Sequence, residues 1–92
     1  MAKRTYKVIS YDVWGNKHDG YEVNDAHYTG MTVKLPDDAT DKQIVQALKA
    51  CGYLKKTLKT KSVAIHGDDE FSIYFDDARN GKPEGELRRV EL

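Results

Sequence analysis

Residues 40–52, TDKQIVQALKACG, carry the clearest secondary-structure pattern in the chain. Thr40 followed by Gln43 is the pattern of a capping box, in which each side chain binds the backbone N–H of the other residue. Gly52 stands where a helix commonly ends in a left-handed residue. The apolar stripe that repeats at helical spacing consists of Ile44, Val45, Leu48 and Cys51. These signals predict a helix from about residue 41 to residue 51.

The segments around this helix have the composition of β-strands. They are rich in β-branched and aromatic residues, and several alternate apolar with polar positions. Three candidates precede the helix and three follow it: residues 5–13, 21–28, 31–35, 62–66, 70–75 and 86–92. Gly30 is expected to break the run after the second candidate, and Pro36 to end the third. Turns are expected at residues 67–69 and 76–85, the latter containing Asn80-Gly81.

A helix with one apolar stripe has to bury that stripe against another element, and here the only partner is a sheet. We therefore predict an α+β fold: a curved antiparallel sheet with one α-helix packed on a face, in the order β-β-β-α-β-β-β. The length of 92 residues suits a single domain over residues 1–92. The sheet face opposite the helix would then stay open for docking.

The composition predicts a soluble protein of the cytoplasm. Cys51 is the only cysteine, so no internal disulfide can form. The N-terminus MAKRTYKVIS lacks the apolar run of a signal peptide, and no segment approaches the ~20 apolar residues of a membrane span. We expect no membrane association.

No pattern in the sequence indicates catalysis, a metal or a cofactor. The three histidines and Cys51 lack zinc-site spacing, and the adjacent acidic pairs fall in predicted turns or at the helix start. We therefore expect a non-catalytic protein without a metal site or cofactor. The alternative is a small enzyme in which His27, His66 and an Asp converge from distant positions.

The segment WGNKHDG, residues 14–20, places the only Trp of the chain in a predicted hairpin turn. Its ring either folds back as a lid on the core or is offered to a partner, because Trp suits both small cores and interfaces. In the second reading, the residues that contact a partner protein are Tyr11, Trp14, Asn16 and His18. A second copy of the chain, giving a homodimer, is another candidate partner.

A basic stretch suggests a different partner, single-stranded nucleic acid. Residues 49–61 contain five lysines and no acid, and an aromatic ring beside such lysines can stack on bases. The candidate residues are Tyr53, Lys55, Lys56, Lys59 and Lys61, helped by Arg88 and Arg89. The chain carries 15 basic and 15 acidic residues, unlike a dedicated duplex-DNA binder. Residues 68–77 contain five acids and no base, and we expect this hairpin to lie beside the basic stretch and neutralise it, so nucleic acid ranks below protein as the partner.

Three segments resemble small uncharacterised proteins encoded by bacteriophages and other mobile elements of bacteria. They are ISYDVWGN (9–16), DGYEVND (19–25) and ELRR (86–89). The resemblance implies an accessory protein that acts inside a bacterial host cell, where such proteins bind a host protein, inhibit a defence factor or assist DNA handling. It assigns no site residues. The leading prediction is a binding protein that acts by contact with a host protein.

Overall fold

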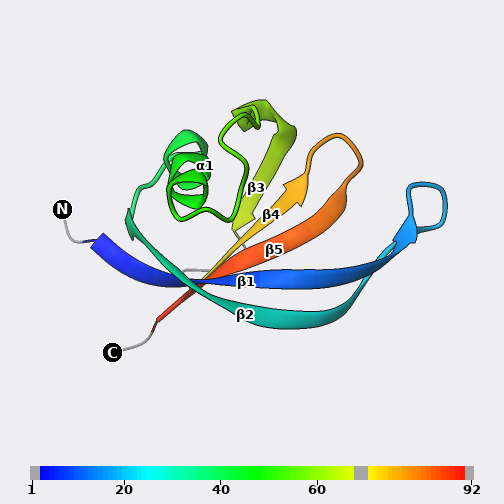
Figure 1. Ribbon diagram of the computed structural model, residues 1–92, viewed down its shortest axis with the longest axis horizontal. Coiled ribbons are helices and arrows are strands. Elements are labelled where there is room, and N and C mark those ends of the chain that lie inside the picture. The colour runs from blue at the N-terminus through cyan, green and yellow to red at the C-terminus, as the bar shows by residue number, and fades with distance from the viewer. Residues whose placement is uncertain (1–2, 68–70, 91–92) are drawn as a thin grey trace.

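The computed structural model describes residues 3–67 and 71–90 as two layers, an antiparallel sheet and one helix packed on a face of it (Figure 1). The elements are β1 (Lys3–Asn16), β2 (Gly20–Pro36), α1 (Asp41–Ala50), the 3-10 helix η1 (Thr60–Ser62), β3 (Val63–Gly67), β4 (Ser72–Asp77) and β5 (Lys82–Arg89). The five strands lie in the order β2-β1-β5-β4-β3. The predicted α+β class, with one helix on an antiparallel sheet, is confirmed.

Helix α1 forms as its sequence predicts. The Thr40 side chain accepts from the Gln43 backbone N–H at 3.2 Å, and the Gln43 side chain accepts from the Thr40 N–H at 2.8 Å. Cys51 is the C-cap, so the helix ends one residue before the predicted boundary, and Gly52 follows with φ +94°. Both ends of the helix are thus fixed by local side-chain and backbone bonds.

The core lies between α1 and the sheet. Its fully or nearly fully buried members are Tyr6, Val8, Val33, Leu35, Ile44, Leu48, Phe75 and Leu87. Leu48 and Phe75 are both 0% exposed. Complete burial of such side chains contributes about 1.5–3 kcal/mol each. This cluster joins the helix to β1, β2, β4 and β5, and it is the main source of stability in the fold.

The predicted strand order is wrong at one point, because β2 runs unbroken from Gly20 to Pro36 and the order is β-β-α-β-β-β. Gly30, with φ +85°, lies in a bulge where residues 29–31 stand opposite Val8 alone. The Thr29 hydroxyl donates to the Val8 carbonyl at 2.8 Å and accepts from the Met31 N–H at 3.1 Å. A side chain replaces the missing ladder bonds, so the strand bends without ending.

The boundary of the last hairpin also differs from the prediction. Residues 76–85 were expected to form a turn, but β4 extends to Asp77 and β5 begins at Lys82. Pro83 is accommodated near the strand start, beside a register shift in the β4–β5 ladder. Three predictions reach beyond the described residues. They are the turn at 67–69 after its first residue, the strand 70–75 at its first residue, and the strand 86–92 at its last two residues.

The first hairpin extends well past the rest of the sheet (Figure 1). β1 pairs with β5 only over Tyr6–Ser10, whereas its pairing with β2 continues to the Asn16–Gly20 pair. Residues 11–28 therefore form a two-stranded extension, which we call the ribbon. The remaining described residues are the packed body.

Candidate functional site

The tip of the ribbon is a short turn built by one side chain. The Asn16 side-chain oxygen accepts from the backbone N–H groups of His18, at 2.9 Å, and Asp19, at 2.8 Å. Gly15 and Gly20 have φ of +110° and +91°, a region that favours glycine. A Cβ at Gly15 would lie 2.2 Å from the Gly20 carbonyl oxygen. Asn16 thus holds the turn together, and His18 is exposed at its tip.

Trp14 is 65% exposed and does not cover the core. Of the two readings of this residue, the structure therefore rules out the lid. Val23 and Tyr28 are also large, apolar and exposed, at 42% and 51%. Among the described residues only Phe71 joins them in that class, so exposed apolar surface is concentrated on the ribbon.

Tyr11 fastens the base of the ribbon to β5. Its hydroxyl donates to a side-chain oxygen of Glu86 at 3.0 Å, and Arg88 donates to the same oxygen at 3.0 Å. Glu86 is only 4% exposed, and this pair of donors compensates its buried charge. Burial, and then the bond to Glu86, raises the pKa of Tyr11. Of the four predicted contact residues, Tyr11 and Asn16 shape the ribbon, while Trp14 and His18 are exposed on it.

The ribbon is acidic although the whole chain is neutral. Residues 11–28 contain the carboxylates of Asp12, Asp19, Glu22 and Asp25. Lys17 is the only Lys or Arg among them, so the ribbon carries a net charge of −3 with neutral histidines. A surface with this charge attracts cationic partners and repels a second acidic surface.

The sheet face opposite α1 carries a mixed row of side chains. Leu87 and Phe75 point into the core, and side chains alternate along a strand, so Glu86 and Tyr74 point to the other face. The paired positions across the five strands are Tyr28, Ile9, Glu86, Tyr74 and His66. His66 stacks on Tyr74 at 5.9 Å between ring centroids. This face combines rings with polar groups.

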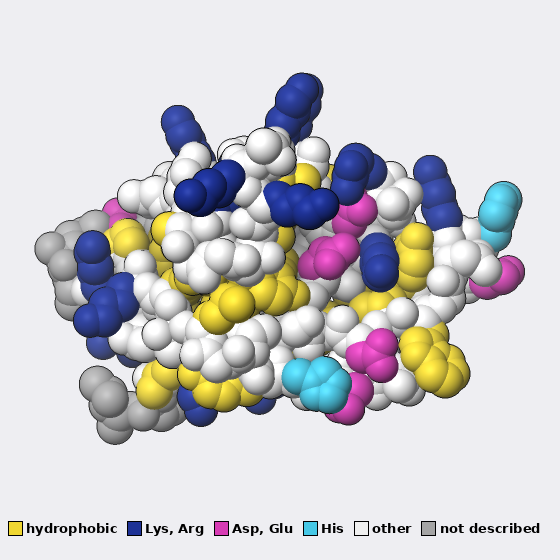
Figure 2. Space-filling model, viewed as in Figure 1, with side chains coloured by type: hydrophobic (Ala, Val, Ile, Leu, Met, Phe, Trp, Pro, Cys, Tyr) yellow, Lys and Arg dark blue, Asp and Glu magenta, His cyan; other side chains and the backbone are white. Residues whose placement is uncertain are grey.

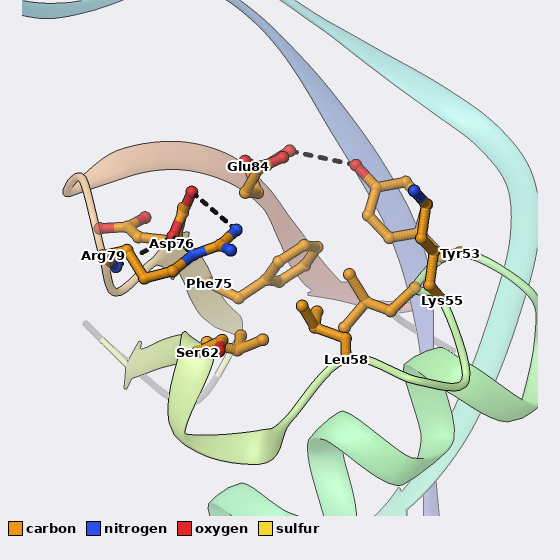
Figure 3. A pocket seen from close by; sticks show the side chains of 11 residues that line it. Tyr53, Lys55, Leu58, Ser62, Phe75, Asp76, Arg79 and Glu84 are labelled. Carbon is orange, nitrogen blue, oxygen red and sulfur yellow. Dashed lines mark hydrogen bonds and ion pairs between the residues drawn. The ribbon is translucent and has the colours of Figure 1, made fainter.

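A cavity of about 340 Å³ lies between the connector after α1 and the β4–β5 hairpin (Figure 3). The rings of Tyr53 and Phe75 meet edge to face, 5.6 Å apart, in its wall. The Tyr53 hydroxyl donates to the backbone carbonyl of Glu84 at 3.1 Å. Burial raises the pKa of the Glu84 carboxyl, because a low dielectric disfavours its charged form. The cavity therefore offers an aromatic wall beside a partly desolvated acid.

The residues proposed for nucleic-acid binding do not share one surface. Lys55, Lys56, Lys59 and Lys61 are exposed on the connector, and Figure 2 shows Lys and Arg side chains standing out over this side of the molecule. Tyr53 is half-buried in the cavity wall on the same side. Arg88 lies on the opposite sheet face with Glu86, and Arg89 lies over the Phe71 ring at 5.6 Å. Asp76 and Asp77 line the cavity together with Lys55.

The histidines also lie apart. His27, on β2, is 3.4 Å from Asp25, whereas His66, on β3, is 3.0 Å from Asp76. β2 and β3 are the two opposite edges of the sheet, so the convergence required by the small-enzyme hypothesis is not formed. Within residues 3–67 and 71–90, no group of three or more His, Cys, Asp or Glu side chains is placed to hold a metal ion.

Comparisons with models of known protein families, with curated proteins and with solved structures find no match for this chain. The resemblance to phage and mobile-element proteins therefore stays a prediction. In the part of the chain that the structure describes, no helix has the length and apolar character needed to cross a membrane.

Two features of the site were not anticipated from the sequence. One is the early separation of β1 from β5, and the other is the buried Glu86 at the ribbon base. Gly85 belongs to the last β1–β5 pair before the separation, and an isolated glycine in a strand often marks such a close backbone approach. A Cβ at this position would lie 2.2 Å from the Ile9 carbonyl oxygen. No pattern in the neighbouring sequence indicates the burial of Glu86.

Proposed function

We propose that this protein is a protein-binding module that acts by contact, with the ribbon as its binding site and Trp14 at the centre of that site. The observation that carries the proposal is the 65% exposure of the only Trp in the chain, on a ribbon that extends past the packed body. Trp is prominent among the residues that dominate binding energy in protein interfaces.

The energetics favour burial of this surface by another molecule. A buried aromatic ring removes 150–250 Å² from water, so covering the exposed part of Trp14 would contribute about 2–4 kcal/mol. A two-stranded ribbon is also only marginally stable by itself. A partner that packs on Trp14, Val23 and Tyr28 would bury apolar surface and stabilise the ribbon at the same time.

The partner that fits best is a protein of the bacterial host. The resemblance of residues 9–16 and 19–25 to phage and mobile-element proteins supports this choice. The acidic ribbon supports it as well, because the negative charge of residues 11–28 repels the phosphates of a nucleic acid.

Affinity capture from a nuclease-treated bacterial lysate tests the proposal. The wild-type chain is compared with Trp14→Ala and with Phe71→Ala, which removes an exposed ring outside the ribbon. We expect Trp14→Ala to reduce the captured protein by at least about tenfold, equivalent to at least about 1.4 kcal/mol, while Phe71→Ala retains it. Circular dichroism would show that both variants fold.

Two outcomes would contradict the proposal. In one, Trp14→Ala captures the same protein as the wild type. In the other, nuclease treatment removes all specific material, which would identify nucleic acid as the partner.

A further inference from the structure

One edge of β1 is open along the ribbon. On its first edge, β1 pairs with β2 over nearly its whole length, from Lys3–Pro36 to Asn16–Gly20. On its second edge it pairs with β5 over Tyr6–Ser10 only. Beyond Ser10 the two strands separate, as Figure 1 shows, and none of the described strands pairs with the second edge of residues 11–15.

The backbone groups that face this opening follow from the alternation along a strand. The Thr5 carbonyl accepts from Val90, which follows β5, and the Val8 carbonyl accepts from Thr29 of β2. Successive residues of a strand present their N–H and C=O groups to opposite edges. The backbone N–H and C=O groups of the odd-numbered residues of β1 therefore point toward β5.

The same alternation divides these residues into a paired and an unpaired set. Ile9 stands opposite Glu86 of β5, so its backbone groups are part of the ladder. Tyr11 and Val13 present the next N–H and C=O groups on this edge, and no described strand stands opposite them. An extended chain could bind there by the same hydrogen bonds that join the other strands.

The opening coincides with contacts that β5 makes to another part of the fold. On the β5 side, the next carbonyl in line is that of Glu84, which would continue the ladder to Tyr11. That carbonyl instead accepts from the Tyr53 hydroxyl at 3.1 Å, and the Tyr53 ring is held by Phe75 (Figure 3). The β1–β5 ladder thus ends beside a carbonyl that already accepts from a side chain of the connector, at the residue where the β4–β5 ladder also shifts register, and β1 has an open edge beyond it.

The net charge of the ribbon indicates which kind of chain would bind at the open edge of β1. Open edges are usually protected by lysine, proline or a covering segment, and residues 11–15 of β1 contain neither lysine nor proline. A second copy of the chain would bring another ribbon of net charge −3 against the first, which is unfavourable. A basic segment of another protein is favoured by the same charge.

The side chains of β1 specify the pattern of that segment. Tyr11 and Val13 lie on one face of the ribbon, and Asp12 and Trp14 on the other, because side chains alternate. An added strand would place apolar side chains beside the first pair. It would place Lys or Arg beside the second pair, where a carboxylate and an exposed aromatic ring both attract cations.

We infer that the open edge of β1, from Tyr11 to Gly15, binds an extended segment of the partner protein as an added strand, in which apolar residues alternate with Lys or Arg. This inference rests on the proposed function and names the chemistry of the partner at the same site. The hydrogen bonds come from the backbone of Tyr11 and Val13, and the selectivity comes from Asp12 and Trp14.

A titration with a defined peptide tests the inference. The probe is acetyl-Lys-Val-Lys-Val-Lys-Val-Lys-amide, and its controls are the Glu-for-Lys counterpart and two versions N-methylated on alternate residues. Trp14 fluorescence reports contact with the ribbon, since it is the only Trp. Amide hydrogen exchange of Tyr11 and Val13 reports strand addition, and the Ile9 amide, already paired with β5, is the internal reference.

The basic peptide should shift Trp14 fluorescence saturably and slow exchange at Tyr11 and Val13 by about tenfold or more, with no change at Ile9. The acidic peptide should bind at least about tenfold more weakly. N-methylation should abolish binding for one alternate set, whose N–H groups face β1, and spare it for the other.

Three results would overturn strand addition. Saturation of Trp14 fluorescence without protection of Tyr11 and Val13 would mean binding by side chains alone, which leaves the proposed function intact. Absence of any saturable change up to about 1 mM peptide would reject this mode, and the capture experiment would decide the proposed function separately. Concentration-dependent protection of the same amides without peptide would identify a second copy as the occupant.

Discussion

The packed body and the ribbon share the strands β1 and β2, yet the body buries its large apolar side chains and the ribbon exposes them. Every buried apolar residue of the described chain lies in the body, whereas three of its four large exposed apolar residues lie in the ribbon. The body also contains the helix, while the ribbon has a net charge of −3. The difference places the stabilising core in the body, and it is the basis on which we propose the ribbon as the binding site.

The largest effect is expected from a change in the body. Leu48→Ala removes a side chain that is 0% exposed at the centre of the core, so it should lower the free energy of unfolding by about 2–5 kcal/mol. Gln46→Ala, on the exposed side of the same helix, should change it by less than about 0.5 kcal/mol. Urea denaturation measures both, and equal costs would mean that the core is not where we place it.

A change at the junction of the two regions should have the next largest effect. Gly85→Ala would place a Cβ 2.2 Å from the Ile9 carbonyl oxygen, so β1 and β5 would have to move apart, at a cost of about 1–3 kcal/mol. Gly67→Ala is the matched control, because a Cβ there would lie 3.7 Å from the Ser72 carbonyl oxygen, an ordinary van der Waals distance. Thermal unfolding of both variants distinguishes the junction from an ordinary strand glycine.

The anchor of the ribbon should have a smaller, pH-dependent effect. Tyr11→Phe removes one of the two donors to buried Glu86 and should cost about 1 kcal/mol at neutral pH. The pKa of Tyr11 is raised in the folded protein, so its contribution is complete below the unfolded-state value of about 10 and is lost as the pH rises above it. Unfolding free energy should therefore fall less steeply above about pH 10 in Tyr11→Phe than in the wild type. Identical slopes would remove Tyr11 as an anchor.

Local signals in the sequence are sufficient for the helix and for most strand positions. Thr40, Gln43 and Gly52 fix the ends of α1 by contacts within a few residues, so they can be read directly. The continuity of β2 could not be predicted in this way, because it depends on a hydrogen bond to a neighbouring strand. The Thr29 hydroxyl donates to the Val8 carbonyl of β1, where backbone bonds between the strands are missing. From the sequence, Gly30 by itself indicates the end of a strand.

The candidate site depends on which strands pair over long sequence distances, and the sequence pattern does not predict this pairing. Trp14 lies on the ribbon, beyond the point where β1 and β5 separate, and the Glu84 carbonyl next to that point accepts from the Tyr53 hydroxyl. These residues are distant in sequence and carry no motif. The sequence could therefore identify Trp14 as unusual, but only the fold shows that its ring is exposed and does not cover the core.

The most direct test of the division between body and ribbon is the free energy of unfolding of Trp14→Ala. Because the ring is 65% exposed, we predict a change of less than about 0.5 kcal/mol relative to the wild type, in urea denaturation with an unchanged m-value. A loss of more than about 2 kcal/mol would show that Trp14 supports the fold, and it would contradict the assignment of the ribbon to recognition.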